Sequence, residues 1–411
     1  MISVYDSKFE CCGCEACRQI CPQQCIHMRE DENGFLYPHI DQNKCVDCGL
    51  CRKSCPYHNS VIKHAADKCY MYLHKDERYR LASASSGAFE AVCRAFSLKT
   101  QEEDIIVFGC ELTTELVVQH SYSIGFSGIG KFKKSKYVQS RINDSYINVR
   151  KFLEAGKRVV FSGTPCQIMG LRLFLKKEYA NLLLVDIICH GVPNQRTFNK
   201  YLDAISKRQG SKIEEFEFRH KVRDSNQIYS CLNTRARFKN GTVISLNCSN
   251  DMFMSTFLAG ILNRDACSQC PFASIERVSD VTLGDFWGIG SYMPKYSEQL
   301  TSGTSLVLFN TAKGKQVGSV LEKEANSICI EFNVDMAVKY NDQLSHPQKF
   351  DGRRDLFFKR LKGHNGFMRA MRACFPERYG IVVCIRNSIY SLTLYKKLSR
   401  IKNKLVKYIS K

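Results

Sequence analysis

The chain has 411 residues, a length that suits two or three domains, and its 44% hydrophobic and 11% aromatic residues exclude a disordered protein. It has no run of eighteen apolar residues and opens without an apolar signal segment, so we expect neither a membrane span nor secretion. With 22 cysteines and no secretory route, we expect a cytoplasmic protein whose thiolates bind metal rather than form disulfides.

The charge is divided unevenly along the chain. Lys and Arg number 60 and Asp and Glu number 40, which gives a net charge of +20. Residues 1–60 hold six basic and eight acidic side chains, so they carry −2 and the rest carries +22. The basic part attracts an anionic substrate, the phosphates of a cofactor, an acidic protein or anionic lipid. No helix-turn-helix, RNA-binding aromatic motif or basic–aromatic strip is present, so we expect no nucleic-acid partner.

An internal repeat fills residues 1–60. The pattern C-x2-C-x2-C-x3-C-P occurs twice, and the second copy starts 34 residues after the first. Its cysteines are Cys11, Cys14, Cys17 and Cys21 in the first copy and Cys45, Cys48, Cys51 and Cys55 in the second. This is the spacing of bacterial two-cluster ferredoxins, in which the fourth cysteine of each copy ligates the other cluster. Zinc sites prefer separate C-x2-C pairs instead.

We therefore predict an α+β ferredoxin-like domain over residues 1–60 that holds two 4Fe-4S clusters. Three cysteines on one tight loop reach three irons of a cluster, and the fourth ligand comes from the other copy. Cluster I is expected to be bound by Cys11, Cys14, Cys17 and Cys55. Cluster II is expected to be bound by Cys45, Cys48, Cys51 and Cys21.

Strands and helices alternate after residue 60. We expect strands at 69–73, 105–110, 158–162 and 182–189, and helices from about 88, at 145–156 and at 166–177. Short β segments are expected over 211–250, and a strand followed by a Gly/aromatic loop over 280–290. This order predicts an α/β body with a largely parallel sheet. We divide the body into an N-terminal part, 61–150, and a C-terminal catalytic part, 151–360.

Four further cysteines stand out by their position or their spacing. Cys166 follows one predicted strand and Cys189 ends the next, so both lie in the crevice where open α/β sheets bind ligands. Cys267 and Cys270 form a C-x2-C-P pair that suits two corners of a cluster. Composition leaves two interpretations open, a third 4Fe-4S cluster or four buried thiols. The other cysteines have no ligand spacing and are expected to be small core residues: Cys12, Cys25, Cys69, Cys93, Cys110, Cys231, Cys248, Cys329, Cys374 and Cys384.

No ordinary nucleotide-binding motif is present, because no GxGxxG follows the first strand and no P-loop occurs. Turns of small residues are weaker candidates for holding the phosphates of a cofactor. They are Ser85, Ser86 and Gly87 at a helix start, and Ser162, Gly163, Thr164, His190 and Gly191 after two strands. Ordinary turns and helix caps have the same composition.

Residues 361–411 are expected to form a basic tail. From 396 to 411 there are seven Lys and Arg and no acidic residue, and apolar residues recur at helical spacing. This pattern predicts a basic amphipathic helix that either packs on the body or makes a peripheral contact with an anionic membrane or partner.

Several of these segments together resemble the coenzyme F420 hydrogenase/dehydrogenase beta-subunit family. The shared motifs are SKYVQS at 135–140, SGTPCQIMGLRLFL at 162–175, LLLVDIICHGVP at 182–193, C-x2-C-P-F at 267–272 and SDVTLGDFWG at 279–288. The resemblance covers about residues 65–360, and residues 1–60 are similar to the ferredoxin domain often fused ahead of it. Two departures are present: Ala88 replaces the second glycine of a Ser-Gly-Gly segment, and 218–224 lacks the family's tryptophan.

The resemblance implies an iron–sulfur flavoprotein. It implies bound FAD and makes Cys166, Cys189, Cys267 and Cys270 the expected ligands of a third 4Fe-4S cluster. We predict an oxidoreductase that transfers electrons between its clusters and a hydride carrier or reducible substrate, linked to coenzyme F420 or to ferredoxin. The alternative is an electron-transfer subunit of a larger redox complex without substrate chemistry of its own. No catalytic residue or proton donor is assigned. His190 lies beside the crevice and is either a proton donor or, as histidines there more often are, a structural residue.

Overall fold

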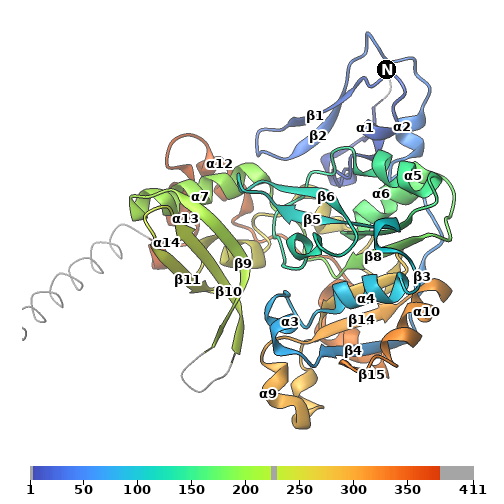
Figure 1. Cartoon of the computed structure of the whole chain (residues 1–411). Coiled ribbons are helices and arrows are strands. Elements are labelled where there is room, and N and C mark those ends of the chain that lie inside the picture. Colours follow the sequence, from blue (N-terminus) through green and yellow to red (C-terminus); the bar gives the residue numbers. More distant parts are fainter. Residues whose placement is uncertain (1–2, 224–228, 380–411) are drawn as a thin grey trace, which may run out of the picture.

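The computed structural model describes residues 3–223 and 229–379 (Figure 1). In Figure 1 the N-terminal part lies at the top, a large sheet with helices fills the centre, and a smaller sheet with its own helices lies on the left. None of the helices among the described residues is long and apolar enough to span a bilayer. The predicted amphipathic helix at 396–411 lies outside the described residues.

The N-terminal residues form a small α+β unit, as expected. Its elements are η1 (Lys8–Glu10), α1 (Ala16–Ile20), β1 (Ile26–Glu30), β2 (Leu36–Ile40) and α2 (Leu50–Lys53). Strands β1 and β2 are antiparallel. Helices α1 and α2 each follow a residue in the left-handed conformation, Glu15 and Gly49, which are equivalent positions of the two repeats. The sequence repeat is therefore also a repeat of backbone conformation.

An eight-stranded sheet forms the centre of the body. In spatial order its strands are β15 (Ser327–Asn333), β4 (Lys68–His74), β14 (Ser305–Phe309), β13 (Val281–Asp285), β8 (Leu182–Ile187), β7 (Arg158–Gly163), β5 (Ile105–Leu112) and β6 (Val118–Ile124). The four central strands β13, β8, β7 and β5 are parallel. Strands β15, β4, β14 and β6 run antiparallel to their neighbours. The expected largely parallel sheet is thus a mixed sheet with a parallel core.

Helices cover both faces of this sheet, which explains the continuous apolar runs at 105–108 in β5 and 182–185 in β8. The buried side chains of α5 (Ser145–Glu154) and α6 (Pro165–Leu175) pack against one face. Those of α4 (Ala88–Phe96) and α10 (Ala312–Leu321) pack against the other face. The sheet takes strands from both 61–150 and 151–360, so the boundary predicted at 150/151 crosses a single structural unit.

A second, antiparallel sheet lies beside the body in Figure 1. It consists of β9 (Ile213–Arg223), β10 (Tyr229–Phe238) and β11 (Val243–Asn247), and the helices packed with it are α7 (Gln195–Gln209), α8 (Met252–Leu258), α12 (Arg354–Leu361) and α13 (Gly366–Cys374). Phe367, Met371 and Cys374 of α13 belong to its core. Residues 361–379 are therefore packed structure rather than tail, because the apolar face of α13 is buried.

The remaining short elements complete the two parts of the body. They are β3 (His64–Ala65), α3 (Glu77–Leu81), η2 (Glu102–Asp104), η3 (Ile129–Phe132), η4 (Asp265–Gln269), β12 (Glu276–Arg277), η5 (Ile289–Ser291), η6 (Pro294–Tyr296), α9 (Ser297–Leu300), α11 (Asp335–Tyr340), η7 (Asp342–Leu344) and α14 (Pro376–Tyr379).

The N-terminal unit is docked on the body through polar side chains that satisfy buried backbone groups. Glu15 accepts a hydrogen bond from the backbone N–H of Ile142 at 2.8 Å. Gln19 accepts one from the backbone N–H of Tyr146 at 3.0 Å, at the start of α5. Gln139 donates to the Cys12 carbonyl at 2.7 Å. Because buried polar groups need partners, these contacts fix the N-terminal unit in one position.

Candidate functional site

The structure brings cysteines of the two repeats close together. One cavity is lined by Cys45, Cys48 and Cys51 of the second repeat together with Cys21 of the first. On the other side of the unit, burial and the neighbouring Cys11 and Cys55 raise the pKa of the Cys17 thiol well above its usual value. Each group thus takes its fourth cysteine from the opposite repeat. The assignment of these eight cysteines to clusters I and II stays a prediction, and this geometry supports it.

Cys25 lies in the core of the N-terminal unit, as expected of a small apolar residue. It is buried beside Ile26 and Ile40. Its Sγ lies 3.4 Å from Sγ of Cys21, and it also lines the cavity of cluster II.

The four separate cysteines of the body lie together in another cavity. We call it the third cavity, because the third cluster is expected there. Cys166 lies in the first turn of α6, Cys189 follows β8, and Cys267 and Cys270 lie at η4. All four line one cavity. Burial raises the pKa of Cys189 to about 12, with Cys166 as the next cause, because neighbouring thiolates repel one another. Thiols gathered in this way fit a thiolate-ligated cluster, whose iron compensates their charge.

Cys12 also lines the third cavity, which the sequence analysis missed. It was expected to be a small core residue, and it is indeed buried. Its thiol interacts with Cys14 of the cluster I group on one side and with Cys166 on the other. One signal was available in the sequence: the equivalent position of the second repeat holds Val46, so Cys12 breaks the repeat.

A large pocket of about 460 Å³ shares a wall with the third cavity. Thr164, Cys166, Cys189, His190 and Gly191 line both. The pocket has the size of a cofactor or substrate site, and it lies where the carboxyl ends of parallel strands β7 and β8 meet.

The pocket collects almost all the residues predicted to hold a cofactor. Those that line it are Ser85, Gly87, Ser162, Gly163, Thr164, His190 and Gly191. Ser86 does not line it, since its hydroxyl points into the protein and hydrogen-bonds Ser305 at 2.9 Å. Ser86 therefore anchors the turn, and its neighbours face the pocket.

Gly87 places the start of α4 against this pocket. Its φ is 95°, and a Cβ at this position would lie 2.9 Å from the Tyr79 ring. Glycine is needed here for both reasons. The free backbone N–H groups at the start of α4 fit an anionic group such as a phosphate. Ala88, which departs from the Ser-Gly-Gly pattern, also lines the pocket.

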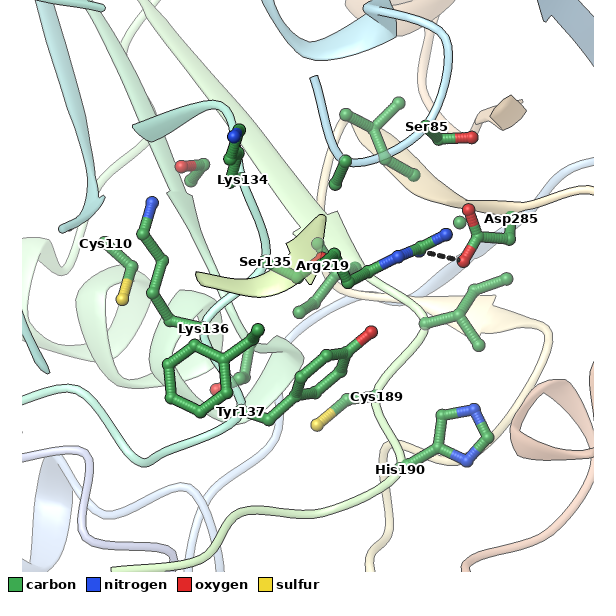
Figure 2. A pocket seen from close by; sticks show the side chains of 18 of the residues that line it. Ser85, Cys110, Lys134, Ser135, Lys136, Tyr137, Cys189, His190, Arg219 and Asp285 are labelled. Atoms are coloured by element: carbon green, nitrogen blue, oxygen red, sulfur yellow. Dashed lines mark hydrogen bonds and ion pairs between the residues drawn. The ribbon is translucent and has the colours of Figure 1, made fainter. Parts of the chain in front are cut away.

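A basic segment at 133–137, for which the sequence predicts no role, forms another wall of the pocket. Lys133, Lys134, Lys136 and Tyr137 line the pocket, and Figure 2 shows three of these together with Arg219. Burial lowers the pKa of Lys136 to about 8. Three lysines within four positions were the available signal, but the sequence does not show that they face the crevice.

Arg219 comes from the stretch that departs from the family pattern. Its guanidinium forms an ion pair of 2.5 Å with Asp285, and both residues line the pocket (Figure 2). Burial lowers the pKa of His190, which faces the same space. The pocket thus offers paired charges, the imidazoles of His120 and His190, and several backbone donors.

Comparison with known proteins confirms the resemblance. Residues 156–332 match the family model that describes the C terminus of the coenzyme F420 hydrogenase/dehydrogenase beta subunit, and residues 10–59 match that of the "4Fe-4S dicluster domain". Both cysteine repeats fall within the second match.

Three curated relatives are similar to short segments of this chain. NADH-quinone oxidoreductase subunit I of Pelobacter propionicus is 34% identical over 59 residues, which are 12% of this chain and 32% of the relative. One component of the anaerobic dimethyl sulfoxide reductase of Escherichia coli is 34% identical over 77 residues, 17% of this chain and 36% of the relative. Ferredoxin 7Fe of Hydrogenibacillus schlegelii is 37% identical over 51 residues, 11% of this chain and 59% of the relative. The chain spans about a third of the length of the first two.

Among solved structures, a chain of the F420-reducing NiFe hydrogenase complex from Methanosarcina barkeri is similar. The identity is 15% and the TM-score 0.45, over 73% of this chain and 94% of that chain.

Proposed function

We propose that this chain, in which a 4Fe-4S dicluster domain precedes the C-terminal domain of the coenzyme F420 hydrogenase/dehydrogenase beta subunit, is an iron–sulfur flavoprotein oxidoreductase. Its electrons pass between clusters I and II, a third cluster, FAD in the large pocket, and a hydride carrier or reducible substrate. A bound flavin accepts single electrons and transfers hydride, and so joins the two kinds of chemistry.

One observation carries this proposal: the third cavity has a neighbour on each side. Cys12 and Tyr57 of the N-terminal unit line it from one side. Cys166, Cys189 and His190 line it and the large pocket from the other side. A cluster in this cavity therefore adjoins both the ferredoxin-type unit and the pocket. Cys48 of cluster II is exposed and the cysteines of cluster I are mostly buried, which supports the order cluster II, cluster I, third cluster, pocket.

The residues of the pocket support FAD as its occupant. The backbone at Gly87 and Ala88 and the lysines at 133–136 are suited to binding a pyrophosphate. His190 is the proposed proton-exchanging group, because its burial keeps the imidazole neutral at pH 7 and it lines the pocket beside Cys189. The basic wall also favours an anionic substrate.

Analysis of the anaerobically purified protein for iron, sulfide and flavin tests the proposal. We expect about twelve irons per chain, four for each of three clusters, and one FAD. A result of about eight irons per chain and no flavin would contradict both the third cluster and the binding of FAD in the large pocket.

An electron-transfer subunit of a larger complex is the second candidate, since the resemblance is to a beta subunit. The enzyme and the electron-transfer subunit are distinguished by mixing the purified chain with reduced coenzyme F420 or reduced ferredoxin. Flavin reduction followed by turnover of an acceptor favours an enzyme. Flavin reduction that leads to turnover only after a partner protein is added favours the subunit.

A further inference from the structure

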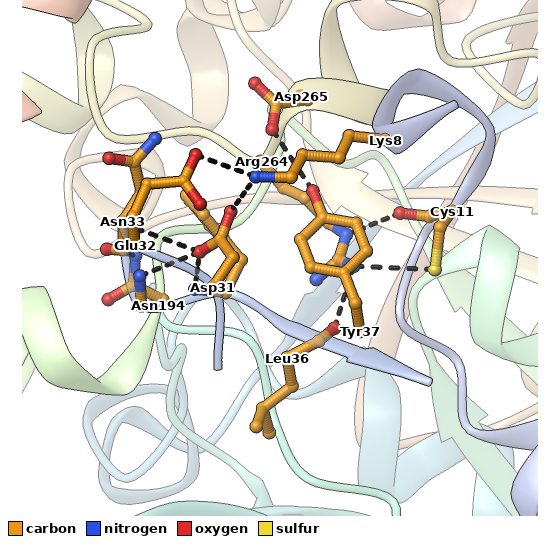
Figure 3. Close-up of polar contacts among 12 residues, drawn as sticks. Lys8, Cys11, Asp31, Glu32, Asn33, Leu36, Tyr37, Asn194, Arg264 and Asp265 are labelled. Atoms are coloured by element: carbon orange, nitrogen blue, oxygen red, sulfur yellow. Dashed lines mark hydrogen bonds and ion pairs between the residues drawn. The ribbon is translucent and has the colours of Figure 1, made fainter. Parts of the chain in front are cut away.

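A single arginine of the body lies against cluster I. Arg264 is fully buried, just before η4, and Figure 3 shows its guanidinium beside Cys11. Its Nη2 donates to Cys11 Sγ at 3.5 Å and to the Leu36 carbonyl at 2.8 Å, and its Nε donates to the Cys11 carbonyl. The guanidinium lies 4.1 Å from the centre of the Tyr37 ring. These contacts fix the cation against one predicted ligand of cluster I.

The backbone of the cysteine loop is shaped around this cation. Gly13 has a φ of 68°, and a Cβ there would lie 2.8 Å from Nη1 of Arg264 and 2.7 Å from Nε2 of Gln139. Gln139 in turn accepts a hydrogen bond from Arg264 at 3.2 Å. The loop between Cys11 and Cys14 therefore leaves space that Arg264 occupies.

The buried charge of Arg264 requires an anion. Asp265, the adjacent carboxylate, accepts a hydrogen bond from Tyr37 and pairs with Arg354 at 2.7 Å. Within residues 3–223 and 229–379, no carboxylate forms an ion pair with Arg264. Its one ionisable acceptor is Cys11, and a buried charge is costly unless it is paired. A thiolate-ligated cluster carries the negative charge that is missing here.

The second repeat has the opposite charge at the equivalent place. Cys45 is the counterpart of Cys11, and its Sγ lies 3.6 Å from the Asp47 carboxylate. Asp47 is itself the counterpart of Gly13 and has a φ of 49°. It is exposed, so solvent weakens its field, whereas Arg264 acts in a buried setting. Two sites with the same ligand spacing thus have a buried cation at one and an exposed anion at the other.

We propose that Arg264 and Asp47 set the relative reduction potentials of clusters I and II, so that cluster I has the higher potential. This inference rests on the proposed function. Reduction adds one negative charge to a cluster. A nearby cation and an N–H···S hydrogen bond stabilise this added charge, whereas a nearby carboxylate destabilises it. One electron leaves reduced cluster II at the surface and reduces oxidised cluster I, so electrons supplied by an external one-electron donor move inward.

A redox titration followed by electron paramagnetic resonance tests this on the full, cluster-loaded chain. The cluster II signal is assigned with a Cys48→Ser variant. We expect cluster I to have the higher midpoint potential, and Arg264→Gln to lower that potential while cluster II is unchanged. Asp47→Asn, which keeps a residue that tolerates positive φ, is expected to raise the cluster II potential by a smaller amount. Iron analysis of each variant accompanies the titration.

Arg354→Gln is the matched control, because Arg354 is also buried and pairs with Asp265 on the same loop but does not touch Cys11. An equal shift of cluster I in Arg354→Gln, or no shift in Arg264→Gln, overturns the inference. If Arg264→Gln does not fold, Asp47→Asn decides, because Asp47 is exposed and its replacement leaves the core intact: an unchanged cluster II potential then overturns the inference. If the unmodified protein lacks the irons of clusters I and II, about eight per chain, the proposed function is contradicted instead.

Discussion

The carboxylate of Asp186 and the guanidinium of Arg277 form an ion pair of 3.0 Å, in which the two side chains are 0% and 1% exposed. Asp186 lies on β8, just before the segment that carries Cys189. Arg277 also donates to the carbonyls of Ile187 and Phe272, each at 3.1 Å. The pair therefore ties the segment of Cys189 to the loop of Cys270, two of the four cysteines of the third cavity.

Removal of Arg277 is expected to destabilise the protein strongly. Arg277→Met leaves Asp186 buried without a partner, which costs about 3–5 kcal/mol of unfolding free energy. Anaerobic denaturation of the loaded protein measures this cost. Arg78→Ala is the control: Arg78 is 91% exposed and pairs with Asp76, and exposed pairs contribute less than about 1 kcal/mol. If the uncompensated charge is the cause, the double variant Asp186→Leu/Arg277→Met recovers part of the loss.

The five thiols of the third cavity are expected to differ in their effect on iron content. The Cys166→Ser variant should lose about four of about twelve irons and keep clusters I and II. Cys12→Ser should keep all of them and change only the spectrum of the neighbouring clusters, because Cys12 lies between Cys14 and Cys166 without ligand spacing. Iron analysis and electron paramagnetic resonance separate the two variants. Loss of four irons in Cys12→Ser with full iron in Cys166→Ser contradicts the proposed ligand set.

These thiols show which parts of the candidate site can be predicted from the sequence. The two repeats are local patterns, so spacing alone predicted which cysteines gather in the N-terminal unit. Cys166 and Cys189 were predicted together because parallel strands place their carboxyl ends at one edge. The roles of Cys12 and Arg264 depend on how the N-terminal unit docks on the body, and no local pattern carries that information.

The sheet shows the same limit. The alternation of strands and helices predicted the parallel core β5, β7 and β8. The antiparallel partners β6 and β14 were not predicted. A short turn after Leu112 leads to β6, whereas residues 286–304, which contain η5, η6 and α9, lead to β14, and neither connection reveals the strand direction. The tail predicted over 361–411 rested on the basic residues at 396–411, and it wrongly included α13, in which Phe367 and Met371 form a buried apolar face.

Gly87→Ala is expected to weaken flavin binding. A side chain at φ 95° is strained, and its Cβ would displace the Tyr79 ring, so the turn at Gly87 that lines the pocket would have to shift. We expect the affinity for FAD to fall at least about tenfold, which corresponds to about 1.4 kcal/mol. Titration of the flavin-stripped protein with FAD, followed by fluorescence, measures this change. Gly156→Ala is a matched control, because Gly156 also has a positive φ, 76°, but a Cβ there meets nothing within 4 Å. A similar loss in both variants points to backbone strain alone.

His120 is expected to make stability depend on pH. Its Nε2–H donates to the Ser162 carbonyl at 2.9 Å, so its Nδ1 accepts from the Ser140 hydroxyl at 2.8 Å. Burial lowers the pKa of His120 to about 4, against about 6.5 in the unfolded chain. The unfolded state therefore binds the proton first as the pH falls, and stability is lost in that direction.

Between pH 7.5 and 5.5 this single group should remove about 1.4 kcal/mol of unfolding free energy. His120→Gln keeps a donor and an acceptor but does not titrate, so its stability should lack this component of the pH dependence. Anaerobic denaturation of both proteins at the two pH values gives the change in unfolding free energy with pH for each protein. The contributions of the other titrating groups are common to both proteins and cancel when the two changes are subtracted. Equal slopes for the two proteins would mean that His120 is protonated in the folded state as readily as in the unfolded one, and that its two hydrogen bonds do not hold it neutral.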